Sequence, residues 1–342
     1  MKKYINTSGL TNSSILYIGP KFFDYELEIK KTLEELGASV DFYDDRPKNN
    51  FLTKALIRLN LKSFIRANID RYYKTIYSDV KDKNYNYVFV ISPETLDYRK
   101  LQKIKNLQDK ATYVLYMWDS FKVKNSFNLI ELFDKVLTFD SQDSEKYNIE
   151  FLPLFYIKGY ENVRKPDVYK HDVCFMATAH SDRYKIVQNI KRQLDGWGLE
   201  IFSFLYLPSK VIYWIRKLFV PRYRYGSVGD FSFNSLSQKE IVGVVEQSKA
   251  VLDINHPLQH GLTMRSIETL GAKRKFITTN ENIRNYEFYN ENNILIVNRK
   301  NPIINRSFLN KEYTVLDAGI YEKYALRTWL TKVFDCEINY YE

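Results

Sequence analysis

One stretch of the sequence, from Ala250 to Asn280, carries most of the side chains that could bind a charged ligand. It predicts a strand, a polar loop, a helix, a basic turn and a second strand. In the helix, Arg265 and Glu268 are three residues apart and therefore lie side by side on its surface. Arginine can bind phosphate through two hydrogen bonds, and a carboxylate can accept hydrogen bonds from sugar hydroxyls. The alternative interpretation is a surface ion pair that only supports the helix.

The loop that leads into this helix is suited to an anionic group. The helix begins after Gly261, and Thr263 lies in its first turn. Free N–H groups and the positive end of the helix dipole attract a phosphate there. Asn255, His256 and His260 lie in the same polar loop. We therefore interpret the loop as half of a binding site, although each histidine alone is also compatible with a purely structural role.

Other candidate residues follow the predicted strands of the chain. His180 and Arg183 come directly after the strand predicted over 172–177, and Asp119 follows the one over 112–118. Ligands of open α/β sheets bind beyond the carboxyl ends of the strands. Arg183 is thus a candidate phosphate contact and Asp119 a candidate general base, with helix capping as the alternative for Asp119 and Asp140. Lys273, in the basic turn after the 262–271 helix, could contact phosphate or simply complement the helix dipole.

These residues are positioned by two series of alternating strands and helices. In the first half, apolar runs predict strands over 14–19, 40–43, 87–91, 112–118, 135–139 and 149–152. In the second half they predict strands over 172–177, 199–204, 250–254, 275–278 and 293–297, with helices over 182–194, 237–248, 262–271 and 318–334. This alternation is typical of parallel sheets with crossover helices. The predicted fold is α/β, with two Rossmann-like domains facing across a cleft.

The domain boundaries follow from a charged stretch near the middle of the chain. Residues 158–170 contain Gly159 and Pro166 and have no apolar period, which indicates a linker. We therefore predict an N-terminal Rossmann-like domain over 1–157 and a C-terminal Rossmann-like domain over 158–317. A C-terminal helical segment over 318–342 is expected to pack back toward the N-terminal domain.

The motif in the second half resembles that of a known family. The segment GLTMRSIETLGAKRKFITTN resembles the donor-binding motif of glycosyltransferases with the two-Rossmann, B-type (GT-B) fold. It looks closest to the spore-maturation-protein type of bacterial glycosyltransferase and its relatives in surface-polysaccharide gene clusters. The segments YMWDSF, LTFDSQDSEKY and FLPLFY of the first half also look like that group.

This resemblance implies a function and roles for several residues. Glu268 matches the family's glutamate near the nucleotide ribose, and His260 stands where retaining members often carry a second glutamate. The implied activity is transfer of a sugar from a nucleotide-sugar donor to a saccharide or lipid-linked saccharide, as in lipopolysaccharide O-antigen or capsule biosynthesis. Asp119 and His260 are then the catalytic candidates. Donor-binding candidates are His180, Arg183, Asn255, His256, Thr263, Arg265, Glu268 and Lys273.

Missing motifs narrow the choice of chemistry. The sequence has no Asp-x-Asp triplet, so we expect a metal-independent reaction that uses no cofactor. It also has no GxxxxGK[ST] and no GxGxxG motif, which argues against a P-loop ATPase or an ordinary NAD enzyme. No secretion signal or transmembrane segment is recognisable, so a cytoplasmic location is expected.

The charge of the chain suggests an anionic partner. The net charge is +10, and the stretch from Ile201 to Gly229 holds five basic residues, several aromatic residues and no acid. A second basic segment over 51–65 places Lys54, Arg58 and Lys62 four residues apart. Either segment could lie on an anionic membrane at the inner face of the cell, or be an ordinary basic surface.

The other functions compatible with the sequence are a sugar-nucleotide 2-epimerase and a nucleic-acid- or membrane-binding protein. No RNA-binding motif is present, so we expect no nucleic-acid partner.

Overall fold

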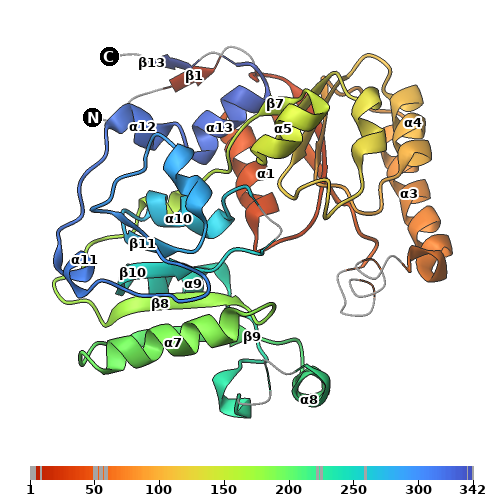
Figure 1. Ribbon diagram of the computed structural model, residues 1–342. Coiled ribbons are helices and arrows are strands. Elements are labelled where there is room, and N and C mark those ends of the chain that lie inside the picture. Colours follow the sequence, from red (N-terminus) through yellow and green to blue (C-terminus); the bar gives the residue numbers. More distant parts are fainter. Residues whose placement is uncertain are drawn as a thin grey trace. The chain divides into compact units, whose positions relative to one another are not determined.

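Two parallel sheets organise the chain into two units (Figure 1). The computed structural model describes residues 5–7, 10–48, 53, 57, 61–220, 223, 226–257, 260–336 and 338–340. The N-terminal unit comprises Met1–Leu154 and Leu326–Glu342, and the C-terminal unit comprises Phe155–Ala325. The chain thus passes from one unit to the other twice, near 154 and near 325, whereas the sequence placed divisions near 157 and 317.

The N-terminal unit is built on a six-stranded parallel sheet with the order β3-β2-β4-β5-β6-β7. Its central strands are almost entirely apolar because helices cover both faces. The strands are β2 (Ser14–Gly19), β3 (Ser39–Asp44), β4 (Tyr87–Ile91), β5 (Thr112–Met117), β6 (Lys135–Thr138) and β7 (Glu150–Phe151). The helices are α1 (Tyr25–Glu35), η1 (Lys62–Ile65), α3 (Arg66–Val80), α4 (Tyr98–Leu107), η2 (Phe127–Leu132) and α5 (Ser141–Tyr147).

The C-terminal unit repeats this plan with a five-stranded sheet of order β12-β11-β10-β8-β9. Its strands are β8 (His171–Thr178), β9 (Ile201–Tyr206), β10 (Ser248–Asp253), β11 (Lys275–Thr278) and β12 (Ile294–Ile296). Its helices are α6 (Lys158–Glu161), α7 (Arg183–Asp195), α8 (Lys210–Phe219), η4 (Val228–Asp230), α9 (Gln238–Glu246), α10 (Met264–Gly271), η5 (Glu281–Asn285), α11 (Arg306–Asn310) and α12 (Ala318–Glu322). Every predicted strand is present, with its ends within two residues of the prediction.

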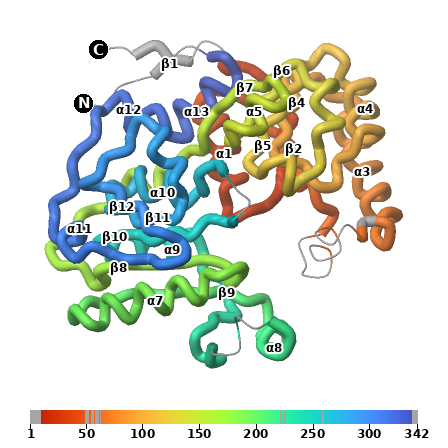
Figure 2. Tube along the Cα trace, in the orientation of Figure 1, coloured from red at the N-terminus to blue at the C-terminus, as the bar shows by residue number. Residues whose placement is uncertain are grey.

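The end of the chain returns to the N-terminal unit (Figure 2). Helix α13 (Leu326–Val333) packs against α1, and the buried Trp329 ring meets the Tyr116 ring edge-on at 4.6 Å. A short antiparallel pair, β1 (Ile5–Thr7) with β13 (Ile338–Tyr340), joins the two ends of the chain. The single helix predicted over 318–334 is wrong, because the segment is interrupted at 323–325, where the carbonyl oxygen of Tyr324 accepts a hydrogen bond from the backbone N–H of Tyr156.

Both sheets share one topological feature that locates a ligand site. In each, the first strand lies between the second and the third, so the chain winds outward in opposite directions from that point. The two switch points lie between β2 and β4 and between β8 and β10. In doubly wound folds, ligands bind at the carboxyl ends of the strands beside such a point. The prediction of an α/β protein with two Rossmann-like domains is therefore confirmed.

The membrane-related expectations concern segments that the structure describes only in part. Lys54 and Arg58 of the predicted basic helix over 51–65 lie outside the described residues, and α3 begins only at Arg66. Within the described part of the chain, no helix is long and apolar enough to span a bilayer.

Candidate functional site

The Arg183 side chain connects the carboxyl ends of β8 and β10 at the switch point of the C-terminal sheet. It is the first residue of α7, and its guanidinium is almost fully buried beneath the loops that follow β8 and β10. Nε donates to the carbonyl oxygen of Ile254 at 2.8 Å, and Nη1 donates to that of Thr178 at 3.1 Å. These acceptors are neutral, so they fix the position of the guanidinium without cancelling its charge. Burial lowers the pKa of Arg183, while the nearby carboxylate of Asp253 opposes that change.

A second arginine, Arg299, reaches the same edge from the loop after β12. Its Nε donates to Asp182 Oδ2 at 2.9 Å, and its Nη1 donates to the carbonyl oxygen of Asn255 at 2.9 Å. The side-chain oxygen of Asn255 also accepts a hydrogen bond from Thr279 Oγ1 at 2.7 Å. Arg299 thus connects the loops after β8 and β10. Sequence analysis missed it, although its position just beyond a strand end was an available signal.

The loop after β8 is held from the other side by α8 and the residues that follow it. Arg216 of α8 and the hydroxyl of Tyr223 both donate to the carbonyl oxygen of Ala179, the latter at 2.8 Å. Ser181, in the same loop, has a left-handed backbone with a φ of 50°. The loop between β8 and α7 is therefore closely constrained by side chains from distant parts of this unit.

Two histidines lie close together at this edge, and one of them is held in its neutral form. The rings of His180 and His256 lie 5.5 Å apart between centroids, and His180 Nδ1 is 3.2 Å from Ser181 Oγ. Burial lowers the pKa of His180 to about 3, with further lowering by Arg183 and by His256, Arg216 and Arg299. The His180 ring is therefore neutral at pH 7. The basic side chains that contribute to this shift in pKa, rather than burial, are the feature that suits an anionic ligand.

Helix α10 starts at this edge at Met264, and Thr263, which the sequence analysis placed in its first turn, is its N-cap. Thr263 accepts a hydrogen bond from the Ser266 amide at 3.3 Å and donates to Asp253 Oδ2 at 2.8 Å. Asp253 is the last residue of β10, and burial raises its pKa. The cap therefore fixes the helix start directly to the end of a central strand.

Arg265 and Glu268 do form an ion pair on α10. Arg265 Nη1 lies 2.6 Å from Glu268 Oε2 and 3.4 Å from the hydroxyl of Tyr160 on α6. Only 7% of the Glu268 side chain is exposed. The pair is therefore buried beside α6 rather than solvated on an outer surface, and a buried pair fixes the positions of its members far more firmly than an exposed one.

Gly271 allows α10 to approach the backbone beside it very closely. A Cβ atom at this position would lie 2.5 Å from Cγ of Tyr156, which is closer than atoms can pack. The hydroxyl of Tyr321 donates to the Gly271 carbonyl oxygen at 2.7 Å. The placement of α10, and with it that of Arg265, thus depends on the absence of a side chain at the last residue of the helix.

Two candidate residues lie elsewhere in the C-terminal unit. Lys273 occupies the turn between α10 and β11, at the amino ends of the strands, with Nζ 4.4 Å from the centre of the Tyr321 ring. There it lines a separate cavity of about 340 Å³. His260 is tied to the loop through its backbone, since its carbonyl oxygen accepts hydrogen bonds from Asn280 and Asn282.

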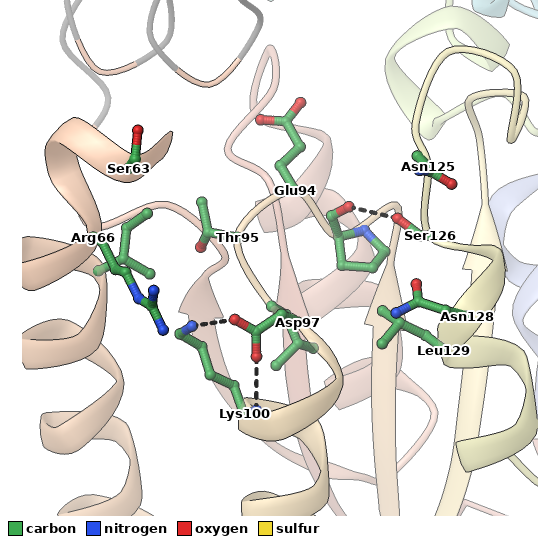
Figure 3. A pocket seen from close by; sticks show the side chains of 13 residues that line it. Ser63, Arg66, Glu94, Thr95, Asp97, Lys100, Asn125, Ser126, Asn128 and Leu129 are labelled. Carbon is green, nitrogen blue, oxygen red and sulfur yellow. Dashed lines mark hydrogen bonds and ion pairs between the residues drawn. The ribbon is translucent and has the colours of Figure 1, made fainter. Parts of the chain in front are cut away.

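The N-terminal unit has its own pocket at the carboxyl end of β4 (Figure 3). Its volume is about 360 Å³. Arg66 and Lys100 lie on one side, and Asn125 and Asn128 lie on the other (Figure 3). The remaining lining residues include the hydroxyl groups of Ser63, Thr95 and Ser126 and the apolar side chains of Ile69, Leu96 and Leu129. Such a mixture of amides, hydroxyls and apolar groups suits a ligand rich in hydroxyls.

One buried carboxylate organises the wall of this pocket. Asp45 accepts hydrogen bonds from the amides of Glu94 at 2.6 Å, Thr95 at 2.9 Å and Leu96 at 2.9 Å, and from the Tyr73 hydroxyl at 3.0 Å. Burial raises the pKa of Asp45, and the three amides oppose that change. The loop after β4 is therefore preorganised around Asp45, which sequence analysis did not identify.

Asp119 belongs to a chain of ion pairs at the same edge. Lys124 Nζ lies 2.8 Å from Asp119 Oδ2 and 3.1 Å from Glu94 Oε1, and Arg46 pairs with the other oxygen of Glu94. Burial by itself would raise the pKa of Glu94, but Arg46 and Lys124 lower it to about 2. Asp119 is thus a lysine-paired, partly exposed carboxylate. The helix cap considered as an alternative exists at Asp140, which accepts hydrogen bonds from the amides of Gln142 and Asp143.

Comparison with known proteins identifies the fold. Neither a family model nor a curated protein sequence matches the chain. HepE from Anabaena, solved with UDP and glucose, is similar in structure, with a TM-score of 0.60 at 9% identity over 95% of this chain and 99% of that one. An α-glucosyltransferase solved with UDP and a 13-mer DNA has a TM-score of 0.55 at 11% identity over 95% and 90%. A Listeria monocytogenes protein assigned as a UDP-N-acetylglucosamine 2-epimerase has 0.53 at 8% identity over 95% and 97%.

These similarities extend over nearly the whole chain and define the fold as GT-B. The same fold serves both sugar transfer and epimerisation in the proteins compared. Fold by itself therefore does not select the reaction, which must be argued from the site.

Proposed function

We propose that this protein is a glycosyltransferase that moves a sugar from a nucleotide-sugar donor to a saccharide or lipid-linked saccharide. The observation that carries the proposal is the buried Arg183 at the β8/β10 switch point, whose guanidinium donates to neutral carbonyl oxygens, with Arg299 bonded to the same loop after β10. A nucleotide sugar contributes a diphosphate that matches this charge. Two of the GT-B proteins compared above were solved with UDP, which supports the same ligand class.

The donor-binding residues divide into three groups by the part of the donor that each suits. Arg183 and the loop with His180, Asn255 and His256 would hold the diphosphate, assisted by the start of α10 at Thr263. Arg265 and Glu268 would hold the ribose and the adjacent phosphate. Lys273 is left out of this proposal because its turn lies at the amino ends of the strands.

Catalysis would depend mainly on stabilising the departing diphosphate. Fixed positive charges in a partly buried site stabilise a leaving anion without reorganising, which removes the need for a metal ion. In the N-terminal unit, the pocket beside Glu94 would bind the saccharide acceptor. Asp119 would take the proton of the attacking hydroxyl, and His260 would act near the transferred sugar.

The biological setting that we propose follows from the sequence resemblance. It is the assembly of bacterial surface polysaccharide, such as lipopolysaccharide O-antigen or capsule, at the cytoplasmic face of the cell membrane. A lipid-linked acceptor would bring the enzyme into peripheral contact with that membrane.

The first test is to measure thermal stability against a panel of nucleotides and nucleotide sugars. A ligand that binds only the native state raises the melting temperature, by an amount that grows with its concentration. We expect a shift with at least one nucleotide diphosphate and with its sugar conjugate. Absence of any shift at millimolar ligand would contradict the proposal.

The second test uses Glu268→Gln and Arg265→Ala with the identified donor. Both should abolish transfer while unfolding remains cooperative, and full activity in both variants would refute the donor assignment. Glu268→Gln is the more informative variant because it keeps the side-chain volume and removes only the charge.

A 2-epimerase is the second candidate, because the Listeria protein shares the fold and the donor edge would serve either reaction. Epimerisation needs no acceptor. Product analysis with the donor alone therefore separates the two enzymes. A nucleic-acid-binding protein would instead bind with a steep dependence on salt and show no affinity for nucleotide sugars.

A further inference from the structure

Helix α8 presents its polarity in the reverse of the usual sense. Large apolar side chains on it are exposed to between 53% and 74%, and we call them the α8 apolar face: Val211, Trp214, Ile215, Leu218 and Phe219. At 3.6 residues per turn they fall within an arc of about 140°. A helix on the surface of a water-soluble domain normally turns its apolar stripe inward.

The opposite side of α8 is the one that is anchored to the protein. Tyr213 is buried, and its hydroxyl donates to the Gly226 carbonyl oxygen at 2.9 Å. Lys217 Nζ lies 3.0 Å from the same hydroxyl, and Arg216 bonds to Ala179. The side chain of Ser209 caps the helix start. The outward orientation of the apolar face is therefore fixed by hydrogen bonds and cannot be relieved by rolling the helix.

The sequence that contains this face is rich in basic residues. From Ile201 to Gly229 the sequence contains Lys210, Arg216, Lys217, Arg222 and Arg224 and no aspartate or glutamate. Lys210 is exposed at the first residue of α8, and Lys217 Nζ lies 5.7 Å from the centre of the Trp214 ring. Apolar side chains with an exposed tryptophan, bordered by lysine and arginine, are the features of helices that lie in a membrane interface.

We propose that α8 docks on an anionic lipid bilayer, with the α8 apolar face inserted at the boundary between headgroups and acyl chains and the exposed Lys210 at the level of the lipid phosphates. A second copy of the chain is a poorer fit for this surface. A ten-residue helix is about 15 Å long and about 10 Å wide, whereas a stable dimer buries about 800 Å² on each partner. A bilayer needs neither that area nor a matching shape.

The inference names the surface for the membrane contact in the proposed function, but its test requires no enzymatic activity. Failure of membrane binding and failure of sugar transfer can therefore be distinguished. Arg216 of α8 donates to the carbonyl oxygen of Ala179, in the loop that contains His180. If the protein both binds membranes and transfers sugar, the donor edge of the C-terminal unit would therefore lie near the lipid surface.

The experiment is cosedimentation of the full chain with vesicles of phosphatidylcholine, with and without phosphatidylglycerol. We expect binding to the anionic vesicles that weakens in high salt. The variant Trp214→Gln/Leu218→Gln/Phe219→Gln should bind at least about tenfold more weakly, because it removes most of the inserted apolar surface. The matched control Val168→Gln/Ile303→Gln/Val315→Gln changes three equally exposed residues of the same unit away from α8 and should bind like wild type.

A second measurement reports insertion directly and does not depend on the triple variant. Lipids brominated in the acyl chains should quench tryptophan fluorescence in wild type, and Trp214→Phe should lose most of that quenching. Equal binding of the wild type and the triple variant would overturn the proposal. Failure of the wild-type protein to bind anionic vesicles would also overturn it. A wild-type dimer that the triple variant dissociates, without vesicle binding, would show instead that the face joins two copies.

Discussion

The carboxyl edges of the two sheets share a topology but differ in charge. At the edge of the C-terminal sheet, Arg183 is bonded to carbonyl oxygens, and burial, with a further contribution from nearby basic side chains, lowers the pKa of His180 to about 3. At the edge of the N-terminal sheet, Arg46 and Lys124 are paired with Glu94, whose pKa falls to about 2. At the C-terminal edge Arg299 is paired with Asp182, but the Arg183 guanidinium donates to neutral carbonyl oxygens. At the N-terminal edge both Arg46 and Lys124 are paired with carboxylates.

The two edges also differ in how their loops are held. In the N-terminal unit, the Asp45 carboxylate gathers three successive amides. In the C-terminal unit, α10 is held by close packing at Gly271 and by the cap at Thr263. The two sheets thus share a topology but hold the loops at their carboxyl ends in different ways, and the proposed function assigns a different ligand to each edge. Each prediction below tests one side of this comparison.

The largest expected effect concerns the charge of the C-terminal edge. Arg183→Met should weaken binding of the donor by about a hundredfold, or about 3 kcal/mol, because it removes a fixed guanidinium beside the diphosphate. Calorimetric titration with the donor identified by thermal shift measures this. The control is Lys100→Met in the N-terminal pocket, which should change donor affinity by less than about twofold. Equal losses in both variants would mean that the edges do not differ as described.

The next effect concerns the loop of the N-terminal edge. Asp45→Asn should lower the free energy of unfolding by about 2–4 kcal/mol, because the amide group that replaces one oxygen cannot accept the loop N–H bonds. Donor affinity should be unchanged in the folded variant. Urea unfolding provides the measurement. Glu34→Gln, which alters an exposed pair with Lys30, is the control and should stay within about 0.5 kcal/mol of wild type.

A smaller effect concerns the packing of α10. Gly271→Ala should cost about 1–3 kcal/mol, since the new methyl group would overlap Tyr156. Gly243→Ala in α9 is a matched control, because no atom lies within 4 Å of the added Cβ there. It should stabilise the protein by about 0.5–1 kcal/mol through helix propensity. Thermal unfolding of both variants gives the comparison, and equal stabilities would show that α10 does not depend on the close approach.

The smallest effect concerns pH. The pKa of His180 is about 3 in the folded protein and about 6.5 when unfolded, so its contribution to stability is complete above pH 6.5 and is lost as the pH falls toward 3. Between pH 7 and pH 5, wild type should lose about 1 kcal/mol more stability than His180→Gln, allowing for solvent screening of a partly exposed ring. Urea unfolding at the two pH values checks this. Parallel losses would remove the evidence for a positive edge.

Sequence patterns predicted the elements far better than the contacts between them. The strands followed from apolar runs, and the cap at Asp140 followed from residue type and position. The expected helix over 318–334 was wrong because a tertiary contact of Tyr324, rather than a local helix breaker, interrupts it. Arg299 and Asp45 were missed because their partners lie far along the chain, 117 and about 50 residues away.

The α8 segment likewise separates what the sequence predicts from what tertiary contacts decide. Its amino acids predict a basic, aromatic and amphipathic stretch, but either side of such a helix can face the protein.

The sequence by itself determined where the strands and helices form and which residues stand at the strand ends, because backbone periodicity and capping act over a few residues. Only the tertiary structure decided which charges are cancelled, which carboxylate holds a loop and which side of α8 faces outward. Those outcomes depend on burial and on hydrogen-bond partners that folding brings together from distant positions.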